Sequence, residues 1–92
     1  MIKIYGSHLC PNCRAFLKHL DLHHLPYEFI DINESLDNLK QFLKHRDFNP
    51  IFDECKEINR IGIPAFYDEN TELSIDWIAY LENHNIQIEE TE

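Results

Sequence analysis

The apolar residues at the start of the chain change their spacing twice within the first 32 residues, which limits the fold more than any other feature. Residues 1–5 alternate, with Ile2 and Ile4 on one face, and predict a short strand that ends at Gly6. From Pro11 to about residue 24 the apolar positions recur every three or four residues and predict a helix. Residues 26–32 alternate again, as a second strand would. The residues expected to face inward from the helix are Cys13, Phe16, Leu17 and Leu20. This order predicts a right-handed βαβ unit with parallel strands.

Further helices are predicted in the middle of the chain. Ser35 can cap a second helix, because its side-chain oxygen can accept a hydrogen bond from the first turn, and Asn49-Pro50 interrupts that helix. Residues 51–58 have helical spacing and predict a further short helix. The residues expected to face inward from these two helices are Leu36, Leu39, Phe42, Leu43, Ile51, Phe52, Cys55 and Ile58.

The last third of the chain predicts a hairpin and a helix. Residues 65–67 and 72–75 are joined by the turn sequence Asp68-Glu69-Asn70 and predict two antiparallel strands. Asp76 is a candidate N-cap for a final helix. Its inward residues would be Trp77, Ile78 and Leu81. We therefore predict one α/β domain over residues 1–84, followed by an acidic tail over residues 85–92.

Composition and charge narrow the range of functions. The 92 residues suffice for one compact core, and a hydrophobic content of 43% is typical of a folded domain. Acidic residues number 17 against 8 basic ones, and this net charge of −9 argues against binding nucleic acid or an anionic membrane. No apolar run approaches the ~20 residues that span a bilayer, and the N-terminus lacks a leader pattern. We expect a monomeric cytoplasmic protein whose cysteines are reduced at rest.

The segment Cys10-Pro11-Asn12-Cys13 places two thiols at the predicted start of the first helix. Free backbone N–H groups and the helix dipole favour an anion there, so they favour the thiolate of Cys10. Arg14 and His8 would add positive potential beside it. Cys13 belongs to the inward stripe of the helix. We therefore predict an asymmetric pair, with Cys10 as the accessible nucleophile and Cys13 as the sheltered resolving thiol.

A metal site is the alternative use of these thiols. A structural zinc ion needs four ligands, usually from two such pairs, whereas the third cysteine, Cys55, lies 42 residues beyond Cys13 in an apolar stripe. The six histidines could complete a site. We expect Cys55 to be a small buried apolar residue, and we expect no bound metal or cofactor.

The order of these features is similar to the glutaredoxin and thioredoxin superfamily over about residues 1–84. The resemblance rests on a strand, a CPxC sequence opening a helix, a βαβ unit, and Gly62-Ile63-Pro64 entering a hairpin. It implies a thioredoxin fold, a four-stranded mixed sheet with helices on both faces. It also implies that Pro64, 51 residues beyond Cys13, is in the cis form and faces the dithiol. The backbone of Ile63 would then pair with an extended substrate.

Within the superfamily the size and the CPxC sequence resemble a glutaredoxin. This implies reduction of disulfide-containing proteins or glutathionylated substrates, with glutathione as a co-substrate. The Gly-Gly turn that holds glutathione in the family is missing before the last helix, and Ser7 stands where many members have a lysine. Asp76 would replace part of the glutathione contact, and Tyr5 would line the substrate groove. A donor of the thioredoxin-reductase type is the alternative reductant.

Two other classes of function are compatible with the sequence. The stretch from Cys10 to Ile32 is similar to the opening of the arsenate-reductase-like regulators, which would make the chain a partner-binding redox sensor. A dimeric iron–sulfur carrier that uses Cys10 and external glutathione as ligands is the other alternative, although Pro11 disfavours it.

Overall fold

A computed structural model describes residues 1–88, which form one mixed sheet with helices packed on it. The elements in chain order are β1 (Ile2–Gly6), α1 (Pro11–Leu22), β2 (Tyr27–Asp31), α2 (Leu36–Phe48), the single 3₁₀ turn η1 (Pro50–Phe52), α3 (Asp53–Glu57), β3 (Ala65–Asp68), β4 (Thr71–Ser74) and α4 (Trp77–Asn83). The predicted α/β class is confirmed.

The strand order in the sheet is β2-β1-β3-β4. β1 and β2 are parallel neighbours joined through α1, and Ile4 lies opposite Phe29 in their register. β3 is antiparallel to β1, with Phe66 opposite Ile4, and β4 is antiparallel to β3. The predicted βαβ unit and hairpin are therefore both present, and the sheet is mixed. The predicted strand covers residues 1–5, whereas β1 also includes Gly6, which pairs with Asp31.

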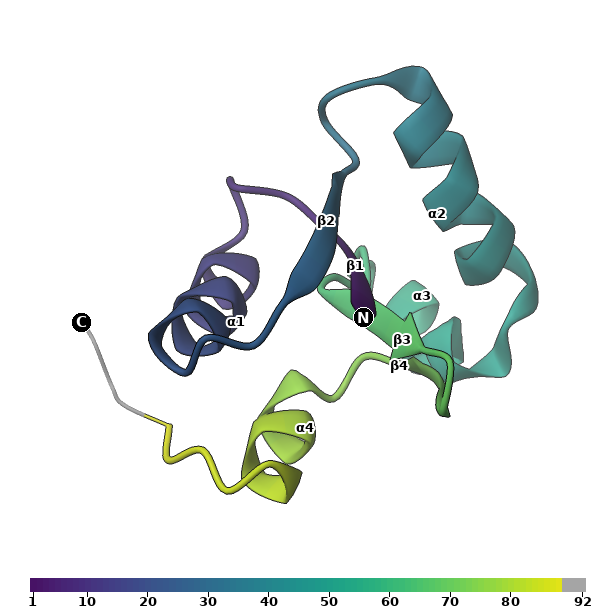
Figure 1. The fold of residues 1–92 in the computed structure, drawn as a ribbon. Helices are drawn as coiled ribbons and strands as arrows, with labels where there is room; N and C mark the ends of the chain where they lie inside the picture. Colours follow the sequence, from purple (N-terminus) through teal and green to yellow (C-terminus); the bar gives the residue numbers. More distant parts are fainter. Residues whose placement is uncertain (89–92) are drawn as a thin grey trace.

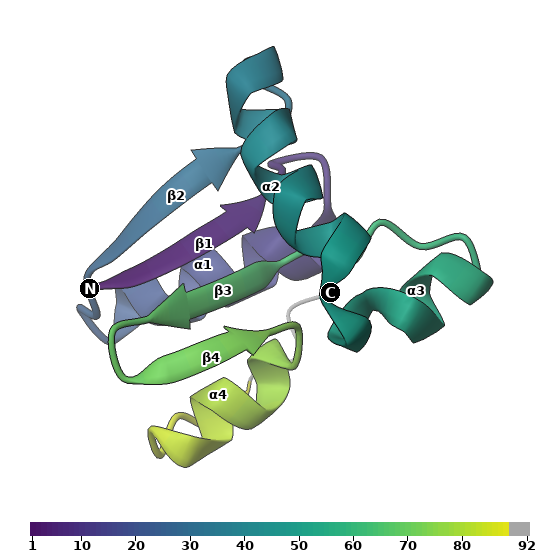
Figure 2. The same ribbon diagram turned by 90° about the vertical axis from the view of Figure 1, so that its right-hand side faces the viewer.

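Helices cover both faces of the sheet, as predicted. Figure 1 shows α1 and α4 on one side of the strands and α2 with α3 on the other, and Figure 2 shows the four strands side by side. Each face buries its own apolar cluster. The cluster on the α1 and α4 side contains Ile2, Ile4, Phe16, Leu17, Leu20, Phe66, Leu81 and Ile86. The cluster on the α2 and α3 side contains Tyr5, Ile30, Ile32, Phe42, Phe52 and Ala65.

Three side chains fix the ends of helices. Ser35 Oγ accepts the N–H of Asn38 at 3.1 Å at the start of α2, as predicted. Asn49 ends α2, and its side-chain oxygen accepts the N–H of Ile51 at 3.0 Å in the following turn. Asp76 Oδ1 accepts the N–H of Ala79 at 3.0 Å at the start of α4. These caps satisfy N–H groups that have no partner within the helices, so the local sequence sets the helix boundaries.

Four residues predicted to face inward are exposed instead. They are Leu36, Ile51, Ile58 and Ile78. Leu36 is the first residue of α2. The region 51–58 is not one continuous helix, since η1 and α3 divide it and only Phe52 and Cys55 are buried. In α4 the inner positions are Trp77 and Leu81, which leaves Ile78 turned away from the sheet.

The packed part of the chain continues past the predicted domain end at residue 84. Ile86 is buried in the cluster on the α1 and α4 side, and Ile88 packs against it. Residues 89–92 of the predicted acidic tail lie outside the described residues. Among the helices of residues 1–88, none combines the length and apolar character needed to cross a membrane.

Candidate functional site

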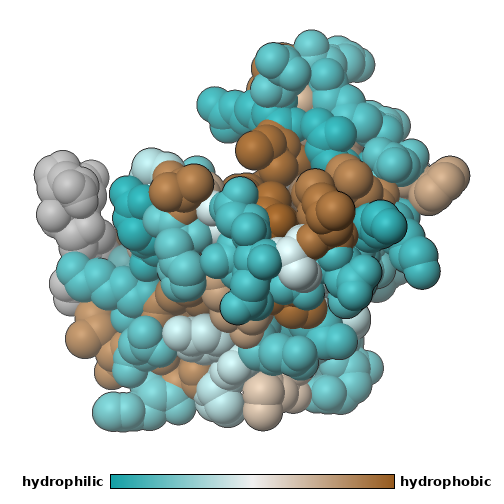
Figure 3. All heavy atoms as spheres, turned by 90° about the horizontal axis from the view of Figure 1, so that it is seen from above, coloured by the Kyte–Doolittle hydropathy of each residue, from teal (hydrophilic) through white to brown (hydrophobic). Residues whose placement is uncertain are grey.

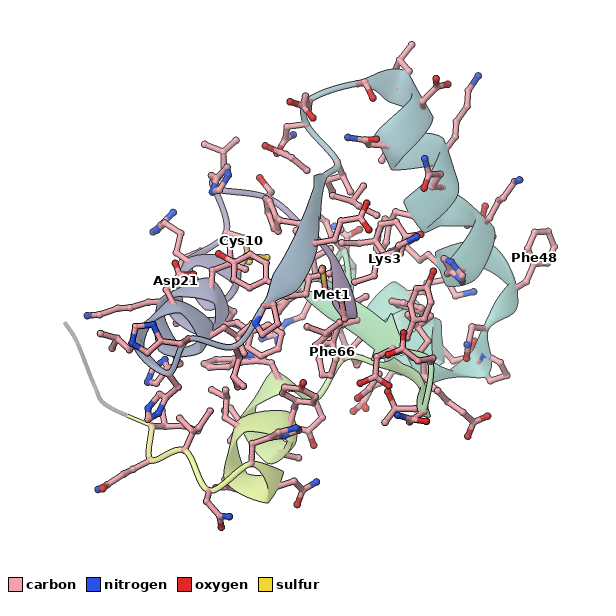
Figure 4. The ribbon with its side chains drawn as sticks, in the orientation of Figure 1. Met1, Lys3, Cys10, Asp21, Phe48 and Phe66 are labelled. Atoms are coloured by element: carbon pink, nitrogen blue, oxygen red, sulfur yellow. The ribbon has the colours of Figure 1, made fainter. Side chains whose placement is uncertain are left out.

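Cys10 lies at the N-terminal end of α1, with its thiol half-buried. Figure 4 shows it at the start of that helix, on the side of β2 away from Phe48. The residue is extended (φ −93°, ψ 121°), and Pro11 is the first helical residue. The Cys10 Sγ accepts the backbone N–H of Cys13 at 3.3 Å, so the sulfur takes the N-cap position. The Cys10 sulfur therefore lies at the positive end of the α1 dipole, beside backbone N–H groups that have no partner within the helix.

Cys13 is wholly buried, one helical turn farther along. Its side chain is 0% exposed, and burial raises the pKa of its thiol to about 12. The thiol lies against the end of β1. A Cβ atom placed on Gly6 would be 2.9 Å from Cys13 Sγ and 3.0 Å from the ring of Phe29, so only glycine leaves room for the sulfur. The predicted asymmetry of the two cysteines is thus present in their burial.

The segment before β3 faces Cys10 from across the site. The peptide bond between Ile63 and Pro64 is cis, as predicted, and Pro64 is buried. The carbonyl oxygen of Ile63 lies 3.9 Å from Cys10 Sγ, a distance that permits a weak S–H···O contact. The fold therefore brings together two predicted site segments that are 53 residues apart in the sequence.

A pocket of about 420 Å³ opens beside Cys10. Pro11 and Asn12 line it beside Cys10, and so does the segment 60–63. Ile75, Trp77 and Cys55 complete its walls. Among the described residues that line it, Arg60 is the one charged side chain, although the whole chain carries a net charge of −9. The thiol therefore meets a pocket of mixed, mainly apolar lining with one cation among the described residues.

A second, smaller hollow of about 200 Å³ lies on another side of Cys10. It shares Cys10, Ile61 and Ile63 with the first pocket and adds the exposed Leu9. Segment 61–63 therefore borders both spaces beside the thiol. Figure 3, which views the molecule from above, shows hydrophobic side chains gathered in one area of that face among hydrophilic ones.

Two residues predicted to contact substrate occupy other places. Tyr5 is 3% exposed in the cluster on the α2 and α3 side, where its hydroxyl lies 3.5 Å from Nε2 of His45. Tyr5 lines neither hollow beside Cys10, because α2 covers the face of the sheet on which it lies. Asp76 caps α4 and lines a different hollow, bounded by β4 and α4, while its neighbours Ile75 and Trp77 line the thiol pocket.

Arg14 and His8 are linked to each other through the backbone. The guanidinium Nη1 of Arg14 donates to the carbonyl of His8 at 2.7 Å, and the ring of His8 packs on Phe29 with 4.8 Å between centroids. The charge of Arg14 lowers the pKa of Cys13, but burial, which raises this pKa, is the largest contribution and Arg14 the smallest. Arg14 therefore orders the loop before Cys10 in addition to supplying a charge nearby.

Three residues that the sequence reasoning did not assign to the site help to build it. Ser7 is buried, donates to Oδ1 of Asn33, and accepts the N–H of Leu9 at 3.1 Å, so it orders the loop that leads to Cys10. Arg46 binds the backbone of the pocket wall from α2. Cys55 is buried as predicted, yet it lines the thiol pocket. No local pattern indicates the contacts of Arg46, because they join segments 14 and 15 residues apart.

Within residues 1–88 no group of three or more His, Cys, Asp or Glu side chains is arranged to hold a metal ion.

No protein family model matches the chain, and no solved structure matches it. A relative from Haemophilus influenzae, described as an uncharacterized protein, is 34% identical over 73 residues, which cover 79% of this chain and 85% of the relative. The chain therefore belongs to the same family as this Haemophilus influenzae protein.

Proposed function

We propose that the protein is a thiol–disulfide oxidoreductase of the glutaredoxin type, built on a thioredoxin fold. Support for the fold comes from the strand order β2-β1-β3-β4, with β1 and β2 parallel and the hairpin antiparallel to β1. Further support comes from the dithiol at the start of α1 and the Ile63-Pro64 segment opposite it. The function is argued from the site itself, because one fold can carry many activities.

The observation that carries the proposal is the difference between the two thiols. Cys10 Sγ borders a pocket, accepts a backbone N–H at 3.3 Å and is half-buried. Cys13 is 0% exposed and keeps its proton, because burial raises the pKa of its thiol to about 12. A reaction that needs an attacking thiolate first and a second thiol later requires such a division. A structural pair of buried cysteines would not need an open pocket beside one sulfur.

In the proposed reaction Cys10 Sγ attacks one sulfur of a substrate disulfide. A new bond forms between these sulfurs, the substrate bond breaks, and the departing sulfur leaves as a thiolate that takes a proton from water. Cys13 then loses its proton and attacks Cys10 Sγ, and the second substrate sulfur leaves as a thiol. Two electrons pass to the substrate, which is reduced, while Cys10 and Cys13 become a disulfide. Two molecules of glutathione, which become glutathione disulfide, or one dithiol reductase, whose thiols become a disulfide, return the two electrons in the reverse exchange.

The surroundings of Cys10 bear on the choice of that external thiol. Ser7 stands at a position where many glutaredoxins, which the sequence resembles, have a lysine. It is buried and hydrogen-bonded to Asn33, and as a neutral residue it offers no positive charge to a substrate carboxylate. Arg60 is the cation that this pocket does supply. Both glutathione and a dithiol reductase are therefore included as reductants in the test.

The test compares variants in two coupled assays. One assay reduces a glutathionylated peptide with glutathione and its reductase, and the other reduces insulin with a thioredoxin reductase. We expect Cys10→Ser to abolish turnover in whichever assay the wild type supports. Cys13→Ser should retain a mixed disulfide between Cys10 and the substrate, detected by intact mass. Lys44→Met, at an exposed position of α2 that lines neither hollow beside Cys10, should retain full activity as the control. Equal residual activity of Cys10→Ser and Cys13→Ser would contradict the assigned roles.

A further inference from the structure

Arg46, in the last turn of α2, makes two hydrogen bonds to the wall of the thiol pocket. Its Nε donates to the carbonyl of Ile61 at 2.7 Å, and its Nη2 donates to the carbonyl of Arg60 at 2.7 Å. One guanidinium thus binds two consecutive carbonyl groups. The two bonds come from different nitrogen atoms of one rigid planar group, so they fix the orientation of the segment as well as its distance from α2.

The same segment is held from two other directions. The N–H of Arg60 donates to the carbonyl of Cys55 at 2.7 Å. Gly62 has φ +94°, a backbone conformation that suits glycine, and a Cβ placed there would lie 2.7 Å from the ring of Phe52. Phe52 is fully buried and cannot easily move away. Of these anchors, the Arg46 side chain is the one that can be removed without disturbing the core or the backbone.

The position of this segment determines the shape of the site. Arg60, Ile61 and Ile63 line the thiol pocket, and Ile61 and Ile63 also line the smaller hollow. The carbonyl of Ile63 lies 3.9 Å from Cys10 Sγ. A shift of the carbonyl groups of residues 60 and 61 would therefore change the surface that a substrate meets, while α1 and its two cysteines would keep their places.

We propose that Arg46 is a positioning residue that holds segment 60–63 as the substrate-facing wall of the Cys10 pocket. Arg46 touches neither thiol, so its effect on a bound substrate is indirect. The proposal rests on the proposed disulfide reduction and adds the element that sets substrate affinity there. Lysine would not replace Arg46, because an ammonium group lacks the planar pair of donors that matches two neighbouring carbonyl groups.

The variants Arg46→Met and Arg46→Lys test this, with Lys44→Met on the same helix as the matched control, since Lys44 is exposed. Steady-state reduction of a small neutral disulfide is measured where circular dichroism shows every variant to be fully folded. We expect KM to rise about tenfold in both Arg46 variants, through loss of two charge-assisted bonds to a segment that keeps its other anchors, with kcat within twofold of wild type. Lys44→Met should leave KM unchanged.

Hydrogen–deuterium exchange of the unreacted proteins gives a second measurement that does not depend on activity. Arg46→Met should raise exchange in residues 59–63 and leave β3 unchanged. The proposal is overturned if exchange there is unaltered, if KM stays at the wild-type value, or if Arg46→Lys behaves like wild type. If the wild-type protein reduces no disulfide, the proposed function fails, and so does the substrate-positioning role. If the wild type reduces the disulfide and Arg46→Met has the same KM, only the role of Arg46 is refuted.

Discussion

The buried thiol of Cys13 gives the most direct quantitative test of the site. In a Cys10→Ser, Cys55→Ser double variant, Cys13 is the one remaining cysteine of the chain. We expect iodoacetamide to alkylate it much more slowly in the folded protein than in the same chain unfolded in urea. Burial is the largest cause of the raised pKa of Cys13, and it is independent of Cys10, so the double variant retains it.

The expected ratio of the alkylation rates in the folded and the unfolded protein follows from the pKa of Cys13 and from the intrinsic reactivity of its thiolate. With Cys10 present, the pKa of Cys13 is raised from 9.0 to about 12, chiefly by burial, which corresponds at pH 8 to about a thousandfold less thiolate in the folded protein than in the unfolded chain. The double variant keeps the burial and loses the smaller contributions of Cys10, so this factor is an upper limit for it. A thiolate of higher pKa is intrinsically the better nucleophile, so each folded thiolate should react roughly 20–30-fold faster than an unfolded one, which offsets part of this loss. These two effects together lower the alkylation rate of the folded protein by up to about 30–50-fold, and the 0% exposure of the side chain slows it further.

The assay follows adduct formation by intact mass at pH 8, in buffer and in urea. Rates that agree within threefold would refute the assignment of Cys13 as the sheltered thiol. The pH dependence gives an independent check. The folded rate should climb about tenfold for each pH unit between 8 and 10, while the unfolded rate levels off above pH 9.

The same proton links Cys13 to the stability of the fold at high pH. Between pH 9 and 12 the folded chain retains a proton that the unfolded chain releases, so the unfolded chain is favoured as pH rises. The stabilisation is complete below pH 9 and is lost on approach to pH 12. Tyr5, whose pKa burial raises to about 12, acts in the same direction above pH 10.

Three substitutions extend these expectations. Gly6→Ala should lower the free energy of unfolding by about 1–3 kcal/mol in urea titration, because the new methyl group would overlap Cys13 Sγ; an unchanged midpoint would contradict the close approach. Ser35→Ala should cost about 1 kcal/mol through loss of the α2 cap, and a cost below 0.3 kcal/mol would count against that cap. Arg60→Gln should lower kcat/KM about tenfold for a small disulfide that carries carboxylates. It should leave kcat/KM unchanged for a neutral disulfide and raise it for a cationic one. The same change in kcat/KM for all three disulfides would exclude a charge contact.

Local chemistry made much of the fold predictable from the sequence. Pro11 marked the start of α1, Ser35 and Asp76 marked two caps, and the alternation of residues 1–5 placed Ile2 and Ile4 on one face. These features depend on residues within a few positions of one another. The cis bond at Pro64 was predicted through the family resemblance, since most X–Pro bonds are trans.

The features that were missed depend on contacts distant in the sequence. Tyr5 alternates with Ile4 and so lies on the other face of β1, but whether that face is open or covered depends on where α2 packs. The double hydrogen bond of Arg46 depends on the path of the chain after α3, which no helical periodicity describes. Cys55 was correctly predicted to be buried, whereas its place in the wall of the pocket follows only from the way α3 folds back toward Cys10.

Arg60 is the one cation among the described residues that line the thiol pocket, in a protein that is acidic as a whole, and this contrast affects how substrates arrive. At a distance, an acidic substrate meets the repulsion of a chain with net charge −9, whereas inside the pocket it meets Arg60 and no carboxylate among the lining residues. Dissolved salt screens charges beyond about 8 Å at physiological ionic strength, so it weakens the distant repulsion more than the close attraction. Capture of acidic disulfides should therefore accelerate as ionic strength rises, the reverse of the behaviour of an enzyme that steers its substrate by long-range attraction.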